Sequence, residues 1–313
     1  MIKLKIGVIG TGAMGQNHLR IYSEMRDVEL VGVCDTDRNR AEFMAKTYKT
    51  TPYFDHNELL KQELDAVSVV VPTTFHTQVA LDVIDSGTHL LVEKPIADTL
   101  ENADAMINAA HDANVKLMVG HVERFNPAIL KLKEIIDSGM LGKIVSISSR
   151  RVGPFNPRIR DVGIIMDLGV HDIDVISFLY SREIKEVYAI AGNDIHSFED
   201  HASILLKCKD NLSGMIETNW LTPHKTRTLT AIGLKGVAYL DYIKQTVELH
   251  DDTWIRTAKI EPREPLKNEL EHFIKTVSNG SEIISNGKTG RHALQVAIAA
   301  IESFHKGKAI KIR

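Results

Sequence analysis

Short apolar runs alternate with amphipathic stretches over the first 121 residues of the chain. The apolar runs have the length of strands and lie at residues 6–9, 29–34, 66–71, 89–92 and 115–120. The stretches between them have the apolar period of a helix at residues 38–48, 77–86 and 100–113, and an earlier helix ends near Met25. Strands that alternate with helices of this length form βαβ units. We therefore predict a doubly wound parallel sheet in an N-terminal domain of residues 1–121.

The pattern changes after residue 121. Pro127 opens a helix that stops at Gly139, and a second helix is predicted around residues 163–180. Strand-like runs dominate the rest and lie at residues 144–149, 186–191, 202–208, 213–219, 226–232 and 237–242, followed by closing helices near 266–278 and 290–305. Successive short strands with tight connections favour antiparallel pairing. Residues 122–313 are therefore predicted to form an α+β domain with a large, open and mainly antiparallel sheet, which makes the whole chain an α/β protein.

The composition excludes several classes of function. The chain has 313 residues, of which 43% are hydrophobic and 25% charged, and its formal net charge is −3. It therefore offers no basic field for nucleic acid and no polybasic anchor for a membrane. Its two cysteines, Cys34 and Cys208, are too few for a disulfide framework, so we expect both to be buried. Residues 1–5 lead into a strand without the apolar stretch of a signal peptide, which favours a soluble, cytoplasmic protein.

A glycine-rich turn follows the first predicted strand and opens a helix. The segment Gly10-Thr11-Gly12-Ala13-Met14-Gly15 has the spacing at which backbone and helix N-terminus bind a pyrophosphate, as in a Rossmann domain. Asp35 ends the second strand, where a carboxylate holds the ribose 2′-hydroxyl of NAD and repels the 2′-phosphate of NADP. We therefore predict NAD as the cofactor. Arg38 and Arg40 follow closely and leave additional use of NADP open.

Two polar segments follow consecutive strands at the carboxyl edge of the parallel sheet, where ligands bind in folds of this type. One segment runs from Val71 to His76, and the other is Glu93-Lys94-Pro95. Cofactor contacts are expected from Pro72, Thr73, His76, Glu93 and Lys94. A lysine at such a strand end can also stabilise a developing alkoxide, although a solvated loop lysine fits the same pattern.

An acid and a histidine share one face of the helix predicted at residues 163–180. Asp167 and His171 are four residues apart, and Asp174 lies one turn further. A carboxylate beside an imidazole fixes its tautomer and strengthens it as a base, which proton removal during hydride transfer requires. A surface pair without a function fits the same spacing. Because the spacing is not that of a recognised ligand set, we expect no metal.

The motifs, taken in this order along the chain, resemble the glucose–fructose oxidoreductase / inositol dehydrogenase family (Gfo/Idh/MocA), and the resemblance covers both predicted domains. It implies an NAD-dependent dehydrogenase acting on a CH–OH group. It also implies the catalytic roles: His171 is the general base, Asp167 orients it, and Lys94 stabilises the alkoxide. Family members often hold the matching Lys–Pro peptide bond cis, which would apply to Lys94–Pro95.

Three further segments bear on the substrate, namely residues 120–127, 150–160 and 219–227. They gather cations and an aromatic residue, and a guanidinium group can bind two phosphate oxygens at once. Substrate contacts are expected from Asp167, His171, His121, Arg124, Asn126, Arg151, Arg158, Arg160 and Trp220. These segments resemble the subgroup of the family that oxidises the 3-hydroxyl of UDP-N-acetylglucosamine to a ketone. Solvent-exposed loops would carry the same charges. A dehydrogenase of a free sugar or polyol such as inositol, and a catalytically silent sensor of sugar or NAD, remain alternatives.

The second predicted domain has more strand than its helices can cover. Six strand-like runs share one long interrupting helix and two closing helices. Sheet area left uncovered would expose apolar side chains, and large apolar patches mark interfaces. Family members commonly pair through this sheet, so we expect a homodimer or a homotetramer with closed symmetry.

Overall fold

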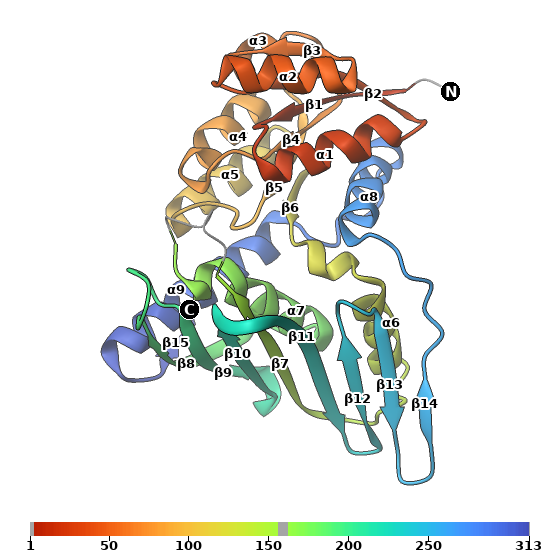
Figure 1. Cartoon of the computed structure of the whole chain (residues 1–313), viewed down its shortest axis with the longest axis vertical. Helices are drawn as coiled ribbons and strands as arrows, with labels where there is room; N and C mark the ends of the chain where they lie inside the picture. The colour runs from red at the N-terminus through yellow and green to blue at the C-terminus, as the bar shows by residue number, and fades with distance from the viewer. Residues whose placement is uncertain (1–2, 156–161, 313) are drawn as a thin grey trace. The chain divides into compact units, whose positions relative to one another are not determined.

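The computed structural model describes residues 3–155 and 162–312, which form two compact units (Figure 1). The first unit contains Met1–Val122 and Leu266–Arg291, and the second contains Glu123–Pro265 and His292–Arg313. This division differs from the predicted one, which placed all of residues 122–313 in one domain. The reason is local bonding: Val119 donates its N–H to the Ser285 carbonyl (2.8 Å) and accepts from Ser285 Oγ (2.7 Å).

The first unit is built on a six-stranded sheet in the order β3-β2-β1-β4-β5-β6, and every pairing in it is parallel. Its strands are β1 Leu4–Ile9, β2 Val28–Cys34, β3 Thr51–Tyr53, β4 Ala66–Val69, β5 His89–Glu93 and β6 Leu117–Gly120. This order is the one found in dinucleotide-binding sheets, and it brings the carboxyl ends of β1 and β4 side by side at the switch point. All four residues of β4 are buried, as expected for a strand covered on both faces.

Three helices of the first unit begin where the sequence supplies a side-chain acceptor for their free N–H groups. Asp37, Asp55 and Thr99 each accept a backbone N–H at the start of α2, α3 and α5. The helices are α1 Ala13–Glu24, α2 Arg38–Tyr48, α3 His56–Leu60, α4 His76–Asp85 and α5 Leu100–Asp112, with a short turn η1 Thr73–Phe75. Helix α8, Pro265–Asn279, joins them from near the C-terminus and buries Leu270 and Phe273.

The second unit contains a nine-stranded sheet in the order β14-β13-β12-β11-β7-β10-β9-β8-β15. Its strands are β7 Ile144–Pro154, β8 Ile184–Gly192, β9 His201–Cys208, β10 Ser213–Asn219, β11 Leu221–Gly233, β12 Gly236–Asp241, β13 Thr246–His250, β14 Ile255–Thr257 and β15 Ile310–Lys311. The pairings are antiparallel except for β7 with β10, which is parallel. The predicted fold class, a parallel dinucleotide-binding sheet plus a mainly antiparallel sheet, is therefore confirmed.

Within the described residues, helices cover one face of the second sheet and leave the other face open. The helices and helical turns in this part of the chain are η2 Val122–Phe125, α6 Pro127–Asp137, η3 Ile165–Gly169, α7 Val170–Tyr180, η4 Lys209–Asn211 and part of α9 Gly287–Lys306. Strands β9 and β10 alternate buried and exposed residues, which is the pattern of a sheet with one packed face. Apolar side chains on the open face include Ile190, Leu205 and Met215, which are 61%, 50% and 48% exposed.

The predicted helix at residues 163–180 begins differently from a regular α-helix. Residues Ile165–Gly169 form a π-helical turn before α7, and the Val170 N–H reaches the Ile165 carbonyl, five residues back. Asp167 lies inside this turn, whereas His171 lies in the first turn of α7. The i, i+4 geometry assumed from the sequence therefore does not apply as a regular α-helical spacing, because π turns are wider.

Several short elements were not predicted, namely β3, α3, β13, β14 and β15. Both cysteines are free and buried, as predicted. Within residues 3–155 and 162–312, no helix has the length and apolar character needed to cross a bilayer.

Candidate functional site

The three glycines of the turn after β1 have different surroundings. Gly10 has a φ of 98°, and a Cβ there would lie 2.4 Å from the Val70 carbonyl oxygen. A Cβ on Gly15 would lie 2.0 Å from the Gly10 carbonyl oxygen. At Gly12, by contrast, no described atom lies within 4 Å of such a Cβ, so the backbone faces open space. The first and third glycines are thus needed by the fold, and the second leaves room for a ligand.

The N-terminus of α1 opens at the same place. Gly12 is its N-cap, and among the described residues no side chain caps it. The first N–H groups of the helix are therefore available to an anion, and the helix dipole favours a negative charge there. Ala13 and Met14 are exposed in this first turn, whereas Thr11 is buried. These features fit the pyrophosphate of a dinucleotide.

Asp35, at the end of β2, is bonded to the glycine turn. Its Oδ2 accepts the N–H (2.9 Å) and the Oγ1 hydroxyl (2.6 Å) of Thr11, and its Oδ1 accepts the Asp37 N–H (2.9 Å). Arg40 Nη1 lies 3.5 Å from Oδ2. Partial burial alone would raise the pKa of Asp35, but these hydrogen bonds and Arg40 hold that pKa below its usual value. The carboxylate is therefore negative at neutral pH, as recognition of a ribose hydroxyl requires.

The ends of β4 and β5 and the segments that follow them contain both exposed and buried residues. Pro72 and Thr73 precede and begin the turn η1, whereas His76 and Glu93 are buried. Lys94 is half-buried, and its peptide bond to Pro95 is cis. Both ring nitrogens of His76 face backbone carbonyls, and its contact with the cofactor stays a prediction. The structure places His18, which the sequence analysis missed, against Glu93.

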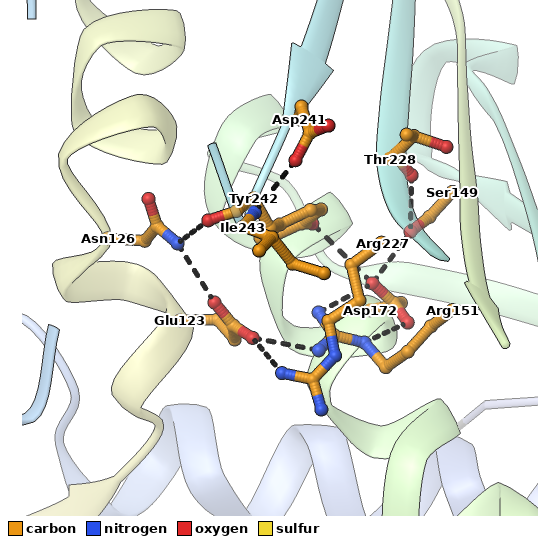
Figure 2. Close-up of polar contacts among 10 residues, drawn as sticks. All are labelled: Glu123, Asn126, Ser149, Arg151, Asp172, Arg227, Thr228, Asp241, Tyr242 and Ile243. Atoms are coloured by element: carbon orange, nitrogen blue, oxygen red, sulfur yellow. Dashed lines mark hydrogen bonds and ion pairs between the residues drawn. The ribbon is translucent and has the colours of Figure 1, made fainter. Parts of the chain in front are cut away.

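In the second unit, the buried groups around α7 form a polar cluster, shown in Figure 2. Arg151, on β7, donates from Nε to Asp172 Oδ2 (2.8 Å) and from Nη1 to Glu123 Oε1 (2.8 Å). Its guanidinium lies over the Tyr242 ring, 4.9 Å from the centroid, and Ser149 Oγ donates to Asp172 Oδ1 (2.7 Å). Burial would lower the pKa of Arg151, but Asp172 and Glu123 raise it well above its usual value. The arginine therefore stays charged within the core.

A second buried pair anchors the same helix. Arg124 donates from Nε and Nη2 to the two oxygens of Asp174, at 2.7 and 2.6 Å. Asn126 caps α6 by accepting the Ala128 N–H (3.1 Å) and donates to Glu123 Oε2 (3.3 Å). Arg124, Arg151 and Asn126 are thus buried and bonded to neighbouring elements, and the contact of each with substrate stays a prediction.

The other predicted substrate residues lie in different settings. Asp167 and His171 are half-buried on η3 and α7, and His121 is buried just after β6. Trp220 is buried against the rings of Phe155 and His196, at centroid distances of 5.2 and 5.9 Å. Arg158 and Arg160 fall outside the described residues.

Arg227, on β11, has the half-exposed guanidinium that the sequence analysis sought in other arginines. Its Nη1 lies 3.8 Å from Glu123 Oε1, at the margin of the cluster in Figure 2. Burial lowers the pKa of Arg227, and the charge of Arg151 lowers it further. The signal available from sequence was its position two residues beyond Lys225 in a strand that also carries His224.

One group of side chains has the spacing of metal ligands. Asp194, Asp200 and His201 offer ligand atoms within 4.8 Å of one another. The buried Asp200 carboxylate, however, accepts the N–H groups of Ile195 (2.7 Å) and His196 (3.1 Å). These bonds account for Asp200 as the residue that shapes the loop between β8 and β9.

Comparisons with known proteins agree with this architecture. A family model described as "Oxidoreductase family, NAD-binding Rossmann fold" matches residues 4–121, and one for the GFO/IDH/MocA C-terminal domain matches residues 129–239. The UDP-N-acetylglucosamine 3-dehydrogenase of Acidithiobacillus ferrooxidans is 28% identical over 97% of this chain and 99% of its own length. The myo-inositol 2-dehydrogenase of Thermotoga maritima is also 28% identical, over 99% of this chain and 98% of its own.

Solved structures are similar over the full length. That of the A. ferrooxidans UDP-N-acetylglucosamine 3-dehydrogenase gives a TM-score of 0.92 at 28% identity, covering 98% of this chain and 99% of that one. An oxidoreductase from Agrobacterium radiobacter, solved with NAD+ and L-tartaric acid, gives a TM-score of 0.93 at 20% identity, covering 99% and 98%. The latter likeness concerns the fold alone. NAD is thus the cofactor of the first unit, in agreement with the open N-terminus of α1.

Replacing Gly12 with valine should block the cofactor without harming the fold. A Cβ at this position meets no described atom, so the melting temperature should stay nearly unchanged, while the branched side chain occupies the space of the pyrophosphate. We expect the Kd for NAD to rise at least about tenfold, or about 1.4 kcal/mol, in a fluorescence titration. Gly15→Ala is the contrasting control, because its Cβ clashes with backbone and should lower the melting temperature. An unchanged Kd for Gly12→Val contradicts the assignment.

Removing the buried arginine should destabilise the protein far more than removing its exposed neighbour. Arg151→Met removes the guanidinium partner of the buried Asp172 and leaves Glu123 only the more distant Arg227, which should cost about 3–5 kcal/mol in the free energy of unfolding. Arg150 pairs with Glu217 at the surface, so Arg150→Met should cost about 0–1 kcal/mol. Urea denaturation of both variants provides the comparison. Equal losses would show that the cluster contributes no more than a surface pair.

Proposed function

Since this chain belongs to the Gfo/Idh/MocA oxidoreductase family, we propose that it catalyses the NAD-dependent oxidation of the 3-hydroxyl of UDP-N-acetylglucosamine to a ketone. The observation that carries this proposal is the full-length similarity, in sequence and in fold, to an enzyme named for that reaction. The oxidation removes a hydride from carbon 3 of the sugar and a proton from its hydroxyl. When bound, NAD would supply the hydride acceptor, and the chain's own residues must then take the proton and stabilise the oxygen.

We assign these tasks to three residues, following the family resemblance. His171 takes the hydroxyl proton on an imidazole nitrogen, and Asp167 orients the ring and stabilises its charged form. Lys94 stabilises the negative charge that develops on the oxygen as the proton leaves. The positions of Lys94 after β5 and of His171 in the first turn of α7 are consistent with these roles, because both side chains are half-buried rather than fully enclosed. Asp35 and the N-terminus of α1 hold the ribose and the pyrophosphate of NAD.

A free polyol such as inositol is the second candidate substrate. The inositol dehydrogenase of T. maritima has the same identity to this chain as the UDP-N-acetylglucosamine enzyme does. Two of the arginines predicted to contact substrate, Arg124 and Arg151, bind internal carboxylates in the structure. The half-exposed Arg227 remains as a group of the second unit that suits an anionic substrate.

We further propose that a second copy of the chain covers the open face of the nine-stranded sheet. Ile190, Leu205 and Met215 contribute to the lining of a shallow groove of about 610 Å³ on this face. Exposed apolar side chains gathered on a sheet face are typical of interfaces between identical subunits. A homodimer, or a homotetramer that contains it, would bury them.

The substrate proposal predicts discrimination by the nucleotide. With NAD in excess, NADH formation should give a kcat/KM for UDP-N-acetylglucosamine at least about 100-fold above that for free N-acetylglucosamine, because a recognised diphosphate adds charge-assisted hydrogen bonds. myo-Inositol is the third substrate in the same assay. Similar values for the free and the nucleotide-linked sugar contradict the proposal, and a preference for myo-inositol replaces it with the second candidate.

If His171 is the general base, its removal should lower turnover and leave cofactor binding unaffected. His171→Ala should lower kcat by about two to four orders of magnitude, the usual scale for removal of a general base, while the Kd for NAD stays nearly unchanged. His224→Ala is a matched control, because His224 is an exposed histidine of the same unit. Near-normal turnover in His171→Ala would show that another group removes the proton.

A further inference from the structure

Lys94 lies between two buried neighbours in the turn after β5. Glu93 ends β5 and is buried, and Pro95 is buried as well, whereas Lys94 is half-buried. The lysine side chain is long and flexible, so its ammonium group can occupy many positions. Movement of the backbone would add to this spread. The bonds made by Glu93 and Pro95 therefore decide where the ammonium can be placed.

On the N-terminal side, a buried histidine of α1 holds Glu93. His18 Nε2 lies 3.1 Å from Glu93 Oε1, and the Lys94 N–H donates to Glu93 Oε2 (3.3 Å). Burial alone would raise the pKa of Glu93, but His18 and Lys94 lower it, so the buried carboxylate is ionised. Gly120 leaves it room, since a Cβ there would lie 3.0 Å from the carboxylate. The backbone of Lys94 is thus tied to α1 through one carboxylate.

On the C-terminal side, the first residue of α4 holds Pro95. His76 Nδ1 lies 2.9 Å from the Pro95 carbonyl oxygen, and His76 Nε2 lies 2.9 Å from the Val71 carbonyl oxygen. The ring is buried and spans the segments that follow β4 and β5. A neutral imidazole donates to one of these carbonyls, and the protonated ring donates to both. The ring therefore ties the turn after β5 to the first residue of α4 when Nδ1 carries a proton, and the protonated ring ties it to the segment that follows β4 as well.

We propose that His18 and His76 are positioning residues for Lys94. This inference rests on the proposed function, in which Lys94 stabilises the oxygen of the substrate. Each histidine fixes the backbone on one side of Lys94, and neither is assigned a contact with substrate. A group that stabilises a transition state must be placed to within a fraction of an ångström, and a displacement of about 1 Å can reduce the rate by about 100-fold. Loosening either tie should therefore reduce turnover by way of Lys94.

A double-mutant cycle separates positioning from a general structural role. His76→Phe keeps a planar ring and removes both ring nitrogens, so it should lower kcat about 10- to 100-fold in the enzyme with Lys94. In the Lys94→Ala background the same change should lower kcat no further, because the group that His76 positions is gone. His76→Gln retains an N–H donor and should recover part of the loss. His18→Gln, assayed in both backgrounds, repeats the test on the other side.

His89→Gln is the matched control, because His89 begins the same strand and accepts the Lys116 N–H (3.2 Å) at the end remote from Glu93. It should leave kcat unchanged. Melting temperatures and the Kd for NAD are measured for every variant. As a readout independent of turnover, the side-chain NMR resonances of Lys94 should shift in His76→Phe and stay in place in His89→Gln.

Two results overturn the inference: an equal fall in kcat in both backgrounds, which marks a structural role, or no fall and no shift of the Lys94 resonances. Normal turnover in Lys94→Ala by itself has a different meaning. It removes the role of Lys94 from the proposed function, and with it the reason for positioning that residue.

Discussion

Burying a guanidinium obliges the surrounding structure to supply carboxylates in fixed places, and this constraint organises the second unit. Arg151 stays charged in the core only because Asp172 and Glu123 accept from it, and those two groups come from α7 and from η2. The Arg124–Asp174 pair repeats the arrangement one half-turn along the helix. Rotating or sliding α7 would separate both pairs at once. The register of the helix that carries His171 is therefore set by charges next to it in the sequence.

The first unit also has a buried charged residue directly before a residue with an assigned chemical role. Glu93 is buried, ionised and bonded to His18, and it lies directly before Lys94. In both units a buried charge stands next to a half-buried residue to which a chemical role is assigned. The buried member cannot move without a large loss of stability, whereas its neighbour is left accessible. Rigidity and access are thus divided between adjacent residues.

Sequence periodicity predicted the elements well wherever burial has a regular pattern. The segment Ala66–Val69 is buried on both faces and was predicted two residues too long, and Arg38–Tyr48, which follows the cap Asp37, was predicted with its observed bounds. β14 was missed because all three of its residues are exposed, and α3 because one turn and a half carries no period. The candidate site was harder. Arg151 was expected to contact substrate, although its period-two spacing from Ile147 already placed it on the packed face of β7. Charge is visible in a sequence, but a buried counter-ion from Glu123, 28 residues away, is not.

The interleaving of the two units along the chain has a consequence for biosynthesis. The first unit lacks α8 until residue 279 has been made, and the second lacks β15 until residue 311 has been made. A ribosome releases the chain from its N-terminus, so the glycine turn emerges long before the segment that packs beside β6. Neither unit is therefore encoded by one continuous stretch of the gene. A gene fragment that ends near residue 121 encodes the first unit without residues 266–291, so its core is incomplete. Recombination between related genes would therefore be tolerated only where each unit keeps its own C-terminal segment, residues 266–291 for the first unit and 292–313 for the second.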